Sequence, residues 1–159
     1  MIVVSDASPL ISLAILDKLD ILDQIFNEIV IPTAVYNEIT QKNKPHLQAL
    51  KKFATNRVKQ VQNRLAVQLL QRELDIGESE AIVLAKENNI SDILIDEYKG
   101  RKIAKANGLS PIGTLGVLIQ AKKKGTIKAV KPELDNLVAN HRKISQKLYD
   151  KALELAGEK

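Results

Sequence analysis

Carboxylates stand at the points of this sequence where short apolar segments end. Asp6 closely follows the apolar residues 2–4, and Asp96 and Glu97 directly follow residues 93–95. Glu38 and Glu80 lie near the starts of two segments with helical apolar spacing. Carboxylates that pack together raise one another's pKa, and a divalent cation bound between them removes that cost. The chemistry such a group could perform is metal-assisted hydrolysis of a phosphodiester.

The composition restricts the kind of metal. The chain has no cysteine, and its two histidines, His46 and His141, are far apart in the sequence. Thiolate zinc sites, disulfides and cysteine nucleophiles are therefore excluded. Any metal must be held by oxygen, which favours Mg²⁺ or Mn²⁺ over zinc.

The charge balance favours a polyanionic partner. Lys and Arg number 24 against 19 Asp and Glu, which gives a net charge of +5. Aromatic residues make up only 3%, so phosphate contacts rather than base stacking on rings would have to supply most of the binding. No apolar run reaches the length of a membrane span and no basic segment precedes the apolar N-terminus, so we expect a cytoplasmic protein with no membrane partner.

Strand and helix patterns alternate along the chain. Each short apolar segment is followed by a helical pattern, with Gly108 and Gly125 closing two of the helices. The predicted strands are residues 2–4, 28–31, 93–95 and a short extended piece at 111–112. This alternation predicts an α/β fold, a three-layer α/β/α sandwich with a short, mainly parallel sheet. The length of 159 residues predicts a single domain, 1–159, in which residues 126–159 form a C-terminal helical extension.

Several polar residues have helix-starting positions. Asp75 and Glu78 fit a capping box, which gives Glu78 a structural role. Glu80 has no such role, so we expect its carboxylate to face the acidic site. Ser8, before Pro9, and Thr114 are predicted helix caps whose hydroxyls also orient the metal ligands.

Two segments are rich in basic residues. Residues 41–72 have a loose pattern, with an extended piece at 56–61 and a helix at 65–70, and are the candidate for a clamp or dimer arm. Lys99, Arg101, Lys102 and Lys105 are predicted to point outward from a helix whose inner face carries Ile103 and Ala104.

Five stretches together resemble the PIN domains, and closely the prokaryotic PIN-like branch related to the VapC toxins. They are VVSDASPLI, VIPTAVYNEI, LDIGESEAIVLA, ILIDEYKGRKIA and IGTLGVLIQAKKKG, and the tail RKISQKLYDKALELAG is similar to that branch as well. The resemblance implies that Asp6, Glu38, Glu80 and Asp96 form a catalytic metal site. It also implies an endoribonuclease dependent on Mg²⁺ or Mn²⁺, commonly a homodimer, and commonly the toxin of a toxin–antitoxin pair held by a small antitoxin protein.

The sequence departs from the family pattern at two acids. The usual fourth acid follows a Thr-x motif, whereas this chain reads Leu94, Ile95, Asp96, Glu97. Either Asp96 or Glu97 could therefore be the metal ligand. Glu80 stands where many relatives have Asp, and its extra methylene could move the ligand outward.

Other functions fit less well or stay open. A haloacid-dehalogenase phosphatase needs a second Asp two residues after the first, and that position is Ser8. A receiver domain needs paired acids at the first strand, where only Asp6 is present. A catalytically weak or inactive PIN-like module that binds nucleic acid or regulates remains the alternative.

Overall fold

Five short strands form one parallel sheet at the centre of the molecule. The computed structural model describes all residues, 1–159, and its strands lie in the order β3-β2-β1-β4-β5. They are β1 (Ile2–Ser5), β2 (Glu28–Pro32), β3 (Val58–Lys59), β4 (Asp92–Leu94) and β5 (Ser110–Ile112). Every neighbouring pair is parallel, so the predicted α/β class is confirmed.

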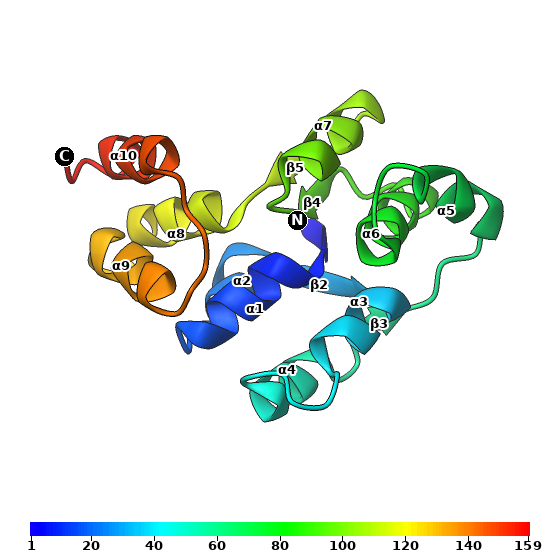
Figure 1. Ribbon diagram of the computed structural model, residues 1–159, viewed down its shortest axis with the longest axis horizontal. Coiled ribbons are helices and arrows are strands. Elements are labelled where there is room, and N and C mark those ends of the chain that lie inside the picture. The colour runs from blue at the N-terminus through cyan, green and yellow to red at the C-terminus, as the bar shows by residue number, and fades with distance from the viewer.

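Ten helices cover the sheet and extend beyond it (Figure 1). They are α1 (Ala7–Ile15), α2 (Ile21–Ile25), α3 (Thr33–Ile39), α4 (Leu47–Ala54), α5 (Arg64–Leu70), α6 (Ile76–Glu87), α7 (Tyr98–Ala106), α8 (Thr114–Lys123), α9 (Lys131–Ala139) and α10 (Gln146–Leu155).

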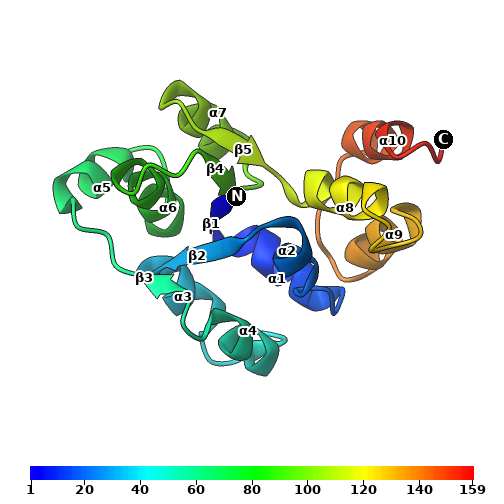
Figure 2. The ribbon, with the colours of Figure 1, turned by 180° about the vertical axis from the view of Figure 1, so that it is seen from behind.

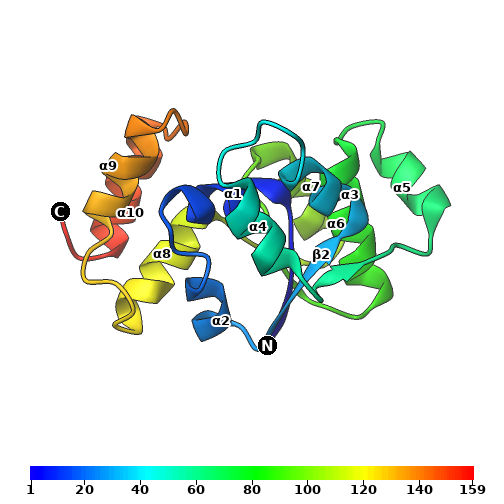
Figure 3. The same ribbon diagram turned by 90° about the horizontal axis from the view of Figure 1, so that it is seen from below.

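The alternation of side chains along each strand divides the core into two layers. Val3 and Leu94 belong to one buried cluster, whereas their neighbours Val4 and Ile93 belong to the other. Figure 3 shows the result: α1, α2 and α8 lie on one side of the strands, and α5 and α6 lie on the other. The sheet is buried on both faces, which explains why its strands read as continuous apolar runs.

The parallel register brings the ends of distant segments to one edge. Ser5 pairs with Leu94, and Leu94 pairs with Ile112. The backbone N–H of Asp6 donates to the carbonyl of Leu94 at 2.8 Å, which continues the ladder by one residue. Asp6, Asp96 and Thr114 therefore leave their strands at the same carboxyl edge, where open α/β sheets place their sites.

Some local predictions hold and others do not. The capping box at Asp75 and Glu78 is present, and Gly108 and Gly125 have the positive φ of a left-handed helix end. The N-cap residues of α1 and α8 are Asp6 and Gly113, so the predicted caps at Ser8 and Thr114 are wrong. Helix α4 was not predicted, although Leu50 and Ala54 form its buried face.

The last two helices pack against the body of the molecule. In Figure 2, α9 and α10 lie beside α8 at the end of the molecule that carries the C-terminus. Leu134, Leu137 and Leu153 are buried in the same cluster as Leu10 of α1. Residues 126–159 thus share a core with the sheet instead of projecting from it.

None of the ten helices combines the length and the apolar character needed to cross a bilayer.

Candidate functional site

Asp6 is a buried acid at the carboxyl edge of the sheet. It follows β1, serves as the N-cap residue of α1, and is only 6% exposed. Burial is the main cause that raises the pKa of its carboxyl, the Ala7 backbone N–H lowers it, and the negative charges of Glu78, Asp75 and Glu38 add to the rise, which brings the pKa to about 8. A carboxylate in this position is strained electrostatically when it is ionised.

Glu38 and Glu78 bring their carboxylates toward Asp6 from two helices. A Cβ atom on Gly77 would lie 3.3 Å from Oε1 of Glu38 and 3.4 Å from Oδ1 of Asp6, so both oxygens border the space that this glycine leaves open. Burial, the largest cause, and repulsion from Asp75 and Glu97 outweigh the lowering effect of the Asp75 backbone N–H and raise the pKa of Glu78 to about 7. Burial and the charge of Asp75 also raise the pKa of Glu38.

These three carboxylates form no ion pair, although the charge of Lys44 partly offsets the raised pKa of Glu38. The ion pairs of the molecule involve other acids, and none includes Asp6, Glu38 or Glu78. Three or more acids do not converge closely enough in this conformation to form a ready-made metal cage. The group is therefore a cluster of buried or half-buried acids without ion-pair partners, which costs free energy whenever its members ionise together.

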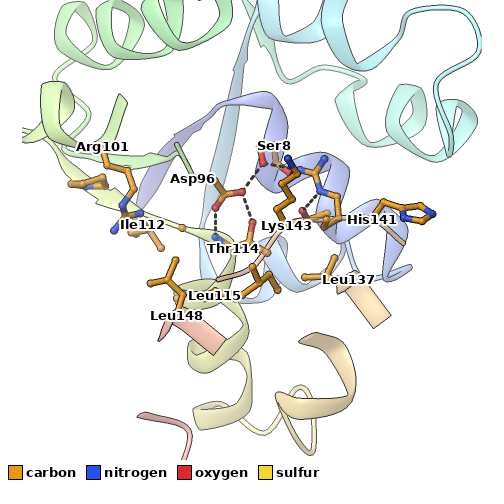
Figure 4. A pocket seen from close by; sticks show the side chains of 16 residues that line it. Ser8, Asp96, Arg101, Ile112, Thr114, Leu115, Leu137, His141, Lys143 and Leu148 are labelled. Carbon is orange, nitrogen blue, oxygen red and sulfur yellow. Dashed lines mark hydrogen bonds between the residues drawn. The ribbon is translucent and has the colours of Figure 1, made fainter. Parts of the chain in front are cut away.

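Asp96 is held rigidly next to this cluster. Its carboxylate accepts hydrogen bonds from the Ser8 hydroxyl at 2.7 Å, the Thr114 backbone N–H at 2.7 Å and the Thr114 hydroxyl at 2.8 Å. These donors come from α1 and the start of α8, so three chain segments meet at one carboxylate (Figure 4). The hydroxyls of Ser8 and Thr114 orient Asp96, which fixes its position relative to Asp6.

The C-terminal segment reaches the same place through Arg142. Its Nη2 donates to the Ser8 hydroxyl at 2.7 Å and to the Ser8 carbonyl at 3.2 Å, and its Nε donates to the Ser12 hydroxyl at 3.0 Å. Because Ser8 in turn donates to Asp96, a chain of hydrogen bonds joins the segment after α9 to the carboxyl edge.

Glu80 has different partners from those the sequence suggested. Its Oε1 accepts from the backbone N–H of Ala34 at 2.9 Å, and its Oε2 pairs with Arg64 at 2.7 Å. The expectation that Glu80 lacks a structural role is therefore wrong: it satisfies a free N–H at the start of α3 and is neutralised by an arginine.

Two further expectations concern residues near Asp96. Glu97 is exposed, but its charge raises the pKa of Glu78, so it lies within electrostatic reach of the cluster. Arg101 does not point outward as predicted, because its Nη1 donates to the carbonyl of Ile95 at 3.0 Å. Its positive charge thus lies beside Asp96 at the carboxyl edge.

The donor set fits a hard divalent cation in its chemistry. Asp6, Glu38, Glu78 and Asp96 offer only oxygen atoms, the ligands that Mg²⁺ and Mn²⁺ prefer. The missing side chain at Gly77 lets two of these carboxylates, Glu38 and Asp6, approach the same point, which a Cβ atom would fill. A bound cation would relieve the burial and repulsion that raise their pKa values.

Two functional candidates were missed by sequence reasoning. Glu78 was assigned to the capping box alone, yet its carboxyl serves both the cap, at 3.2 Å from the Asp75 N–H, and the acidic cluster. The signal in the sequence was that Glu78 directly follows Gly77, a glycine inside a helical pattern. Arg142 gave no local signal, since its partners lie more than 100 residues earlier in the chain.

Comparison with known proteins gives one positive finding. A family model described as a PIN domain matches residues 2–158. Searches of curated proteins and of solved structures found no match.

The raised pKa values predict how stability depends on pH without metal. The folded state keeps the Asp6 proton up to about pH 8, whereas the unfolded chain loses it near 3.8, so the free energy of unfolding should fall as pH rises through this window. Because Asn does not ionise, Asp6→Asn removes this fall in the free energy of unfolding at high pH. In EDTA, the melting temperature of the mutant should exceed that of the wild type by several degrees at about pH 8.5 and by much less at about pH 5.

Asp92→Asn is the matched control, because Asp92 begins β4 at the opposite edge of the sheet. It should shift the melting temperature little at either pH. An Asp6→Asn increment of equal size at both pH values would contradict the electrostatic account.

Proposed function

The chain belongs to the PIN domain family, and from that premise we propose that it is an endoribonuclease dependent on Mg²⁺ or Mn²⁺. The observation that carries the proposal is the cluster of Asp6, Glu38 and Glu78, three acids with raised pKa values that form no ion pair with a basic side chain. Buried acids left uncompensated cost stability, and they are typical of sites where function requires a bound cation.

We assign the metal ligands by their contacts. Asp6, Glu38 and Glu78 would hold the cation, and Asp96 would contribute from the neighbouring strand end with its orientation fixed by Ser8 and Thr114. The family resemblance names Glu80 instead of Glu78, but Glu80 is already neutralised by its ion pair with Arg64, whereas Glu78 and Asp96 form no ion pair. When bound, the cation would polarise the phosphodiester and lower the pKa of the attacking water.

The basic surface beside the site supports a nucleic-acid substrate. Lys99, Lys102 and Lys105 are exposed on α7, which directly follows Glu97 at the carboxyl edge. Arg101 of the same helix faces Asp96. These cations can bind backbone phosphates on either side of the scissile bond, which adds a salt-dependent contribution to affinity.

The motifs shared with toxin-like PIN domains extend the proposal. We propose that the protein acts in the cytoplasm as the toxin of a toxin–antitoxin pair, as a homodimer that a small antitoxin protein restrains. The competing function is an inactive PIN-like module that binds nucleic acid, and the absence of a ready-made cage of three acids is the observation in its favour.

Cleavage separates these two functions. Wild-type protein with Mn²⁺ should cut mixed single-stranded RNA, and EDTA should abolish the cut. Asp6→Asn should lower the rate at least about 100-fold, because a metal ion supplies several kcal/mol of transition-state stabilisation. Asp92→Asn, purified in parallel, should cut at the wild-type rate. Equal rates for wild type and Asp6→Asn, or wild-type cleavage that persists in EDTA, would refute the nuclease.

A second pair of variants decides between the two glutamates of α6. Glu78→Gln should weaken Mn²⁺ binding, measured by calorimetry, about tenfold or more while changing the metal-free melting temperature little or raising it. Glu80→Gln should leave Mn²⁺ binding near the wild-type value and lower the melting temperature by about 2–4 °C, since it loses roughly 1 kcal/mol of pairing with the half-exposed Arg64. If Glu80→Gln weakens Mn²⁺ binding and Glu78→Gln does not, Glu80 is the metal ligand instead of Glu78.

A further inference from the structure

A pocket of about 660 Å³ adjoins Asp96, and neither Asp6 nor Glu38 lines it. Its walls come from α1, α7, β5 and the start of α8 on one hand, and from α9, the connection 140–145 and α10 on the other. Figure 4 shows Asp96 at its rim, with Leu115, Leu137 and Leu148 beyond. Much of the pocket is thus built by the C-terminal segment, which the acidic cluster itself does not need.

The pocket combines an apolar wall with a positive rim. Its apolar side chains are Ile112, Leu115, Leu137, Ile144 and Leu148. Arg101, Arg142 and Lys143 supply positive charge, and Asp96 is the one acid of the lining. A ligand that fits must therefore have a flat or apolar part and a negative part.

The three cations differ in how they are held. Arg142 is fixed by the hydroxyls of Ser8 and Ser12, and Arg101 is fixed by the Ile95 carbonyl. Lys143 is exposed and forms no ion pair or side-chain hydrogen bond. Its ammonium is therefore available for a phosphate, while the two fixed guanidinium groups contribute positive potential and flat surfaces.

An exposed leucine marks the mouth of the pocket. Leu148 leaves 54% of its surface exposed although it lies on the lining. The pocket volume falls within the range of sites for small organic ligands. Unpaired bases in RNA complexes are commonly splayed out and received by apolar side chains and guanidinium planes.

We propose that this pocket binds one unpaired nucleotide of the RNA strand, the nucleotide that neighbours the phosphodiester at the acidic cluster. The base lies against the wall of Leu115, Leu137 and Leu148, and Lys143 contacts its phosphate. This inference rests on the proposed nuclease function for its substrate class. Because the C-terminal segment contributes to the wall that contacts the base, we expect this segment to determine which base the protein prefers at that position.

Binding can be measured without cleavage. Wild-type protein in EDTA is titrated with each of the four ribonucleoside 5′-monophosphates and with ribose 5-phosphate, which lacks only the base, and the backbone amide resonances are followed by NMR. At least one nucleotide should bind about fivefold or more tightly than ribose 5-phosphate, since contact with a base adds favourable free energy. The shifted resonances should include those of residues 113–116 and 141–148.

Two matched pairs of variants locate the contact. Leu148→Gln should bring nucleotide affinity close to that of ribose 5-phosphate, whereas Leu155→Gln, a similarly exposed leucine of the same helix that lies off the pocket, should not. Lys143→Ala should weaken nucleotide and ribose 5-phosphate alike, and Lys147→Ala should weaken neither.

The results separate this inference from the nuclease proposal. If the protein cleaves RNA with Mn²⁺ but binds no nucleotide more tightly than ribose 5-phosphate, the nucleotide pocket is refuted and the nuclease function stands. If a nucleotide binds more tightly than ribose 5-phosphate but RNA is not cleaved, the nucleotide pocket stands and the nuclease function is refuted. Equal losses in Leu148→Gln and Leu155→Gln would also overturn the pocket, because the contact would not lie there.

Discussion

The burial of carboxylates at one sheet edge, to which their mutual repulsion adds, is the constraint on which the candidate site depends. A parallel sheet ends all its strands on one side, and the chain places Asp6 and Asp96 at two of those ends. Helices α3 and α6 add Glu38 and Glu78. Burial and mutual repulsion then raise the pKa of Asp6 to about 8, so the folded protein holds an acidic cluster that a divalent cation would relieve.

The surrounding structure limits where that cation can bind. Glu80 is neutralised by Arg64, and Asp96 is locked by three donors. Gly77 leaves space beside Asp6 and Glu38 where any larger residue would press on their oxygens. The acids without ion-pair partners are Asp6, Glu38 and Glu78, and the pocket formed with residues 141–148 is lined by Asp96 but by none of these three. An RNA strand bound across this edge of the sheet would contact both the acidic cluster and the pocket.

The sequence predicts the fold well because the strand signals are local. Residues 2–4 and 93–95 are apolar on both faces, and only a sheet covered by helices on both sides can bury them. The acids that follow those strands were found for the same reason. Helix α4 was missed because its start at His46 has a left-handed backbone and no capping side chain, so no start signal precedes Leu47.

The details that the sequence does not show depend on contacts between distant segments. Glu78 and Glu80 are two residues apart on α6, and their sequence positions do not show which one Arg64 will pair with. Likewise, Ser8 reads as a helix cap until the fold brings Asp96 and Arg142 to its hydroxyl. Side-chain partners of this kind follow from tertiary packing, which local patterns do not encode.

The most direct test of the account is the position of Mn²⁺ in crystals of the wild-type protein, measured by anomalous scattering at the manganese absorption edge. The account predicts one strong anomalous peak at the carboxyl edge, within coordination distance of the Asp6 carboxylate and of Glu38 or Glu78, with Glu80 still paired to Arg64. A peak coordinated by Glu80 instead of Glu78, or no peak beside Asp6 at saturating Mn²⁺, would contradict it.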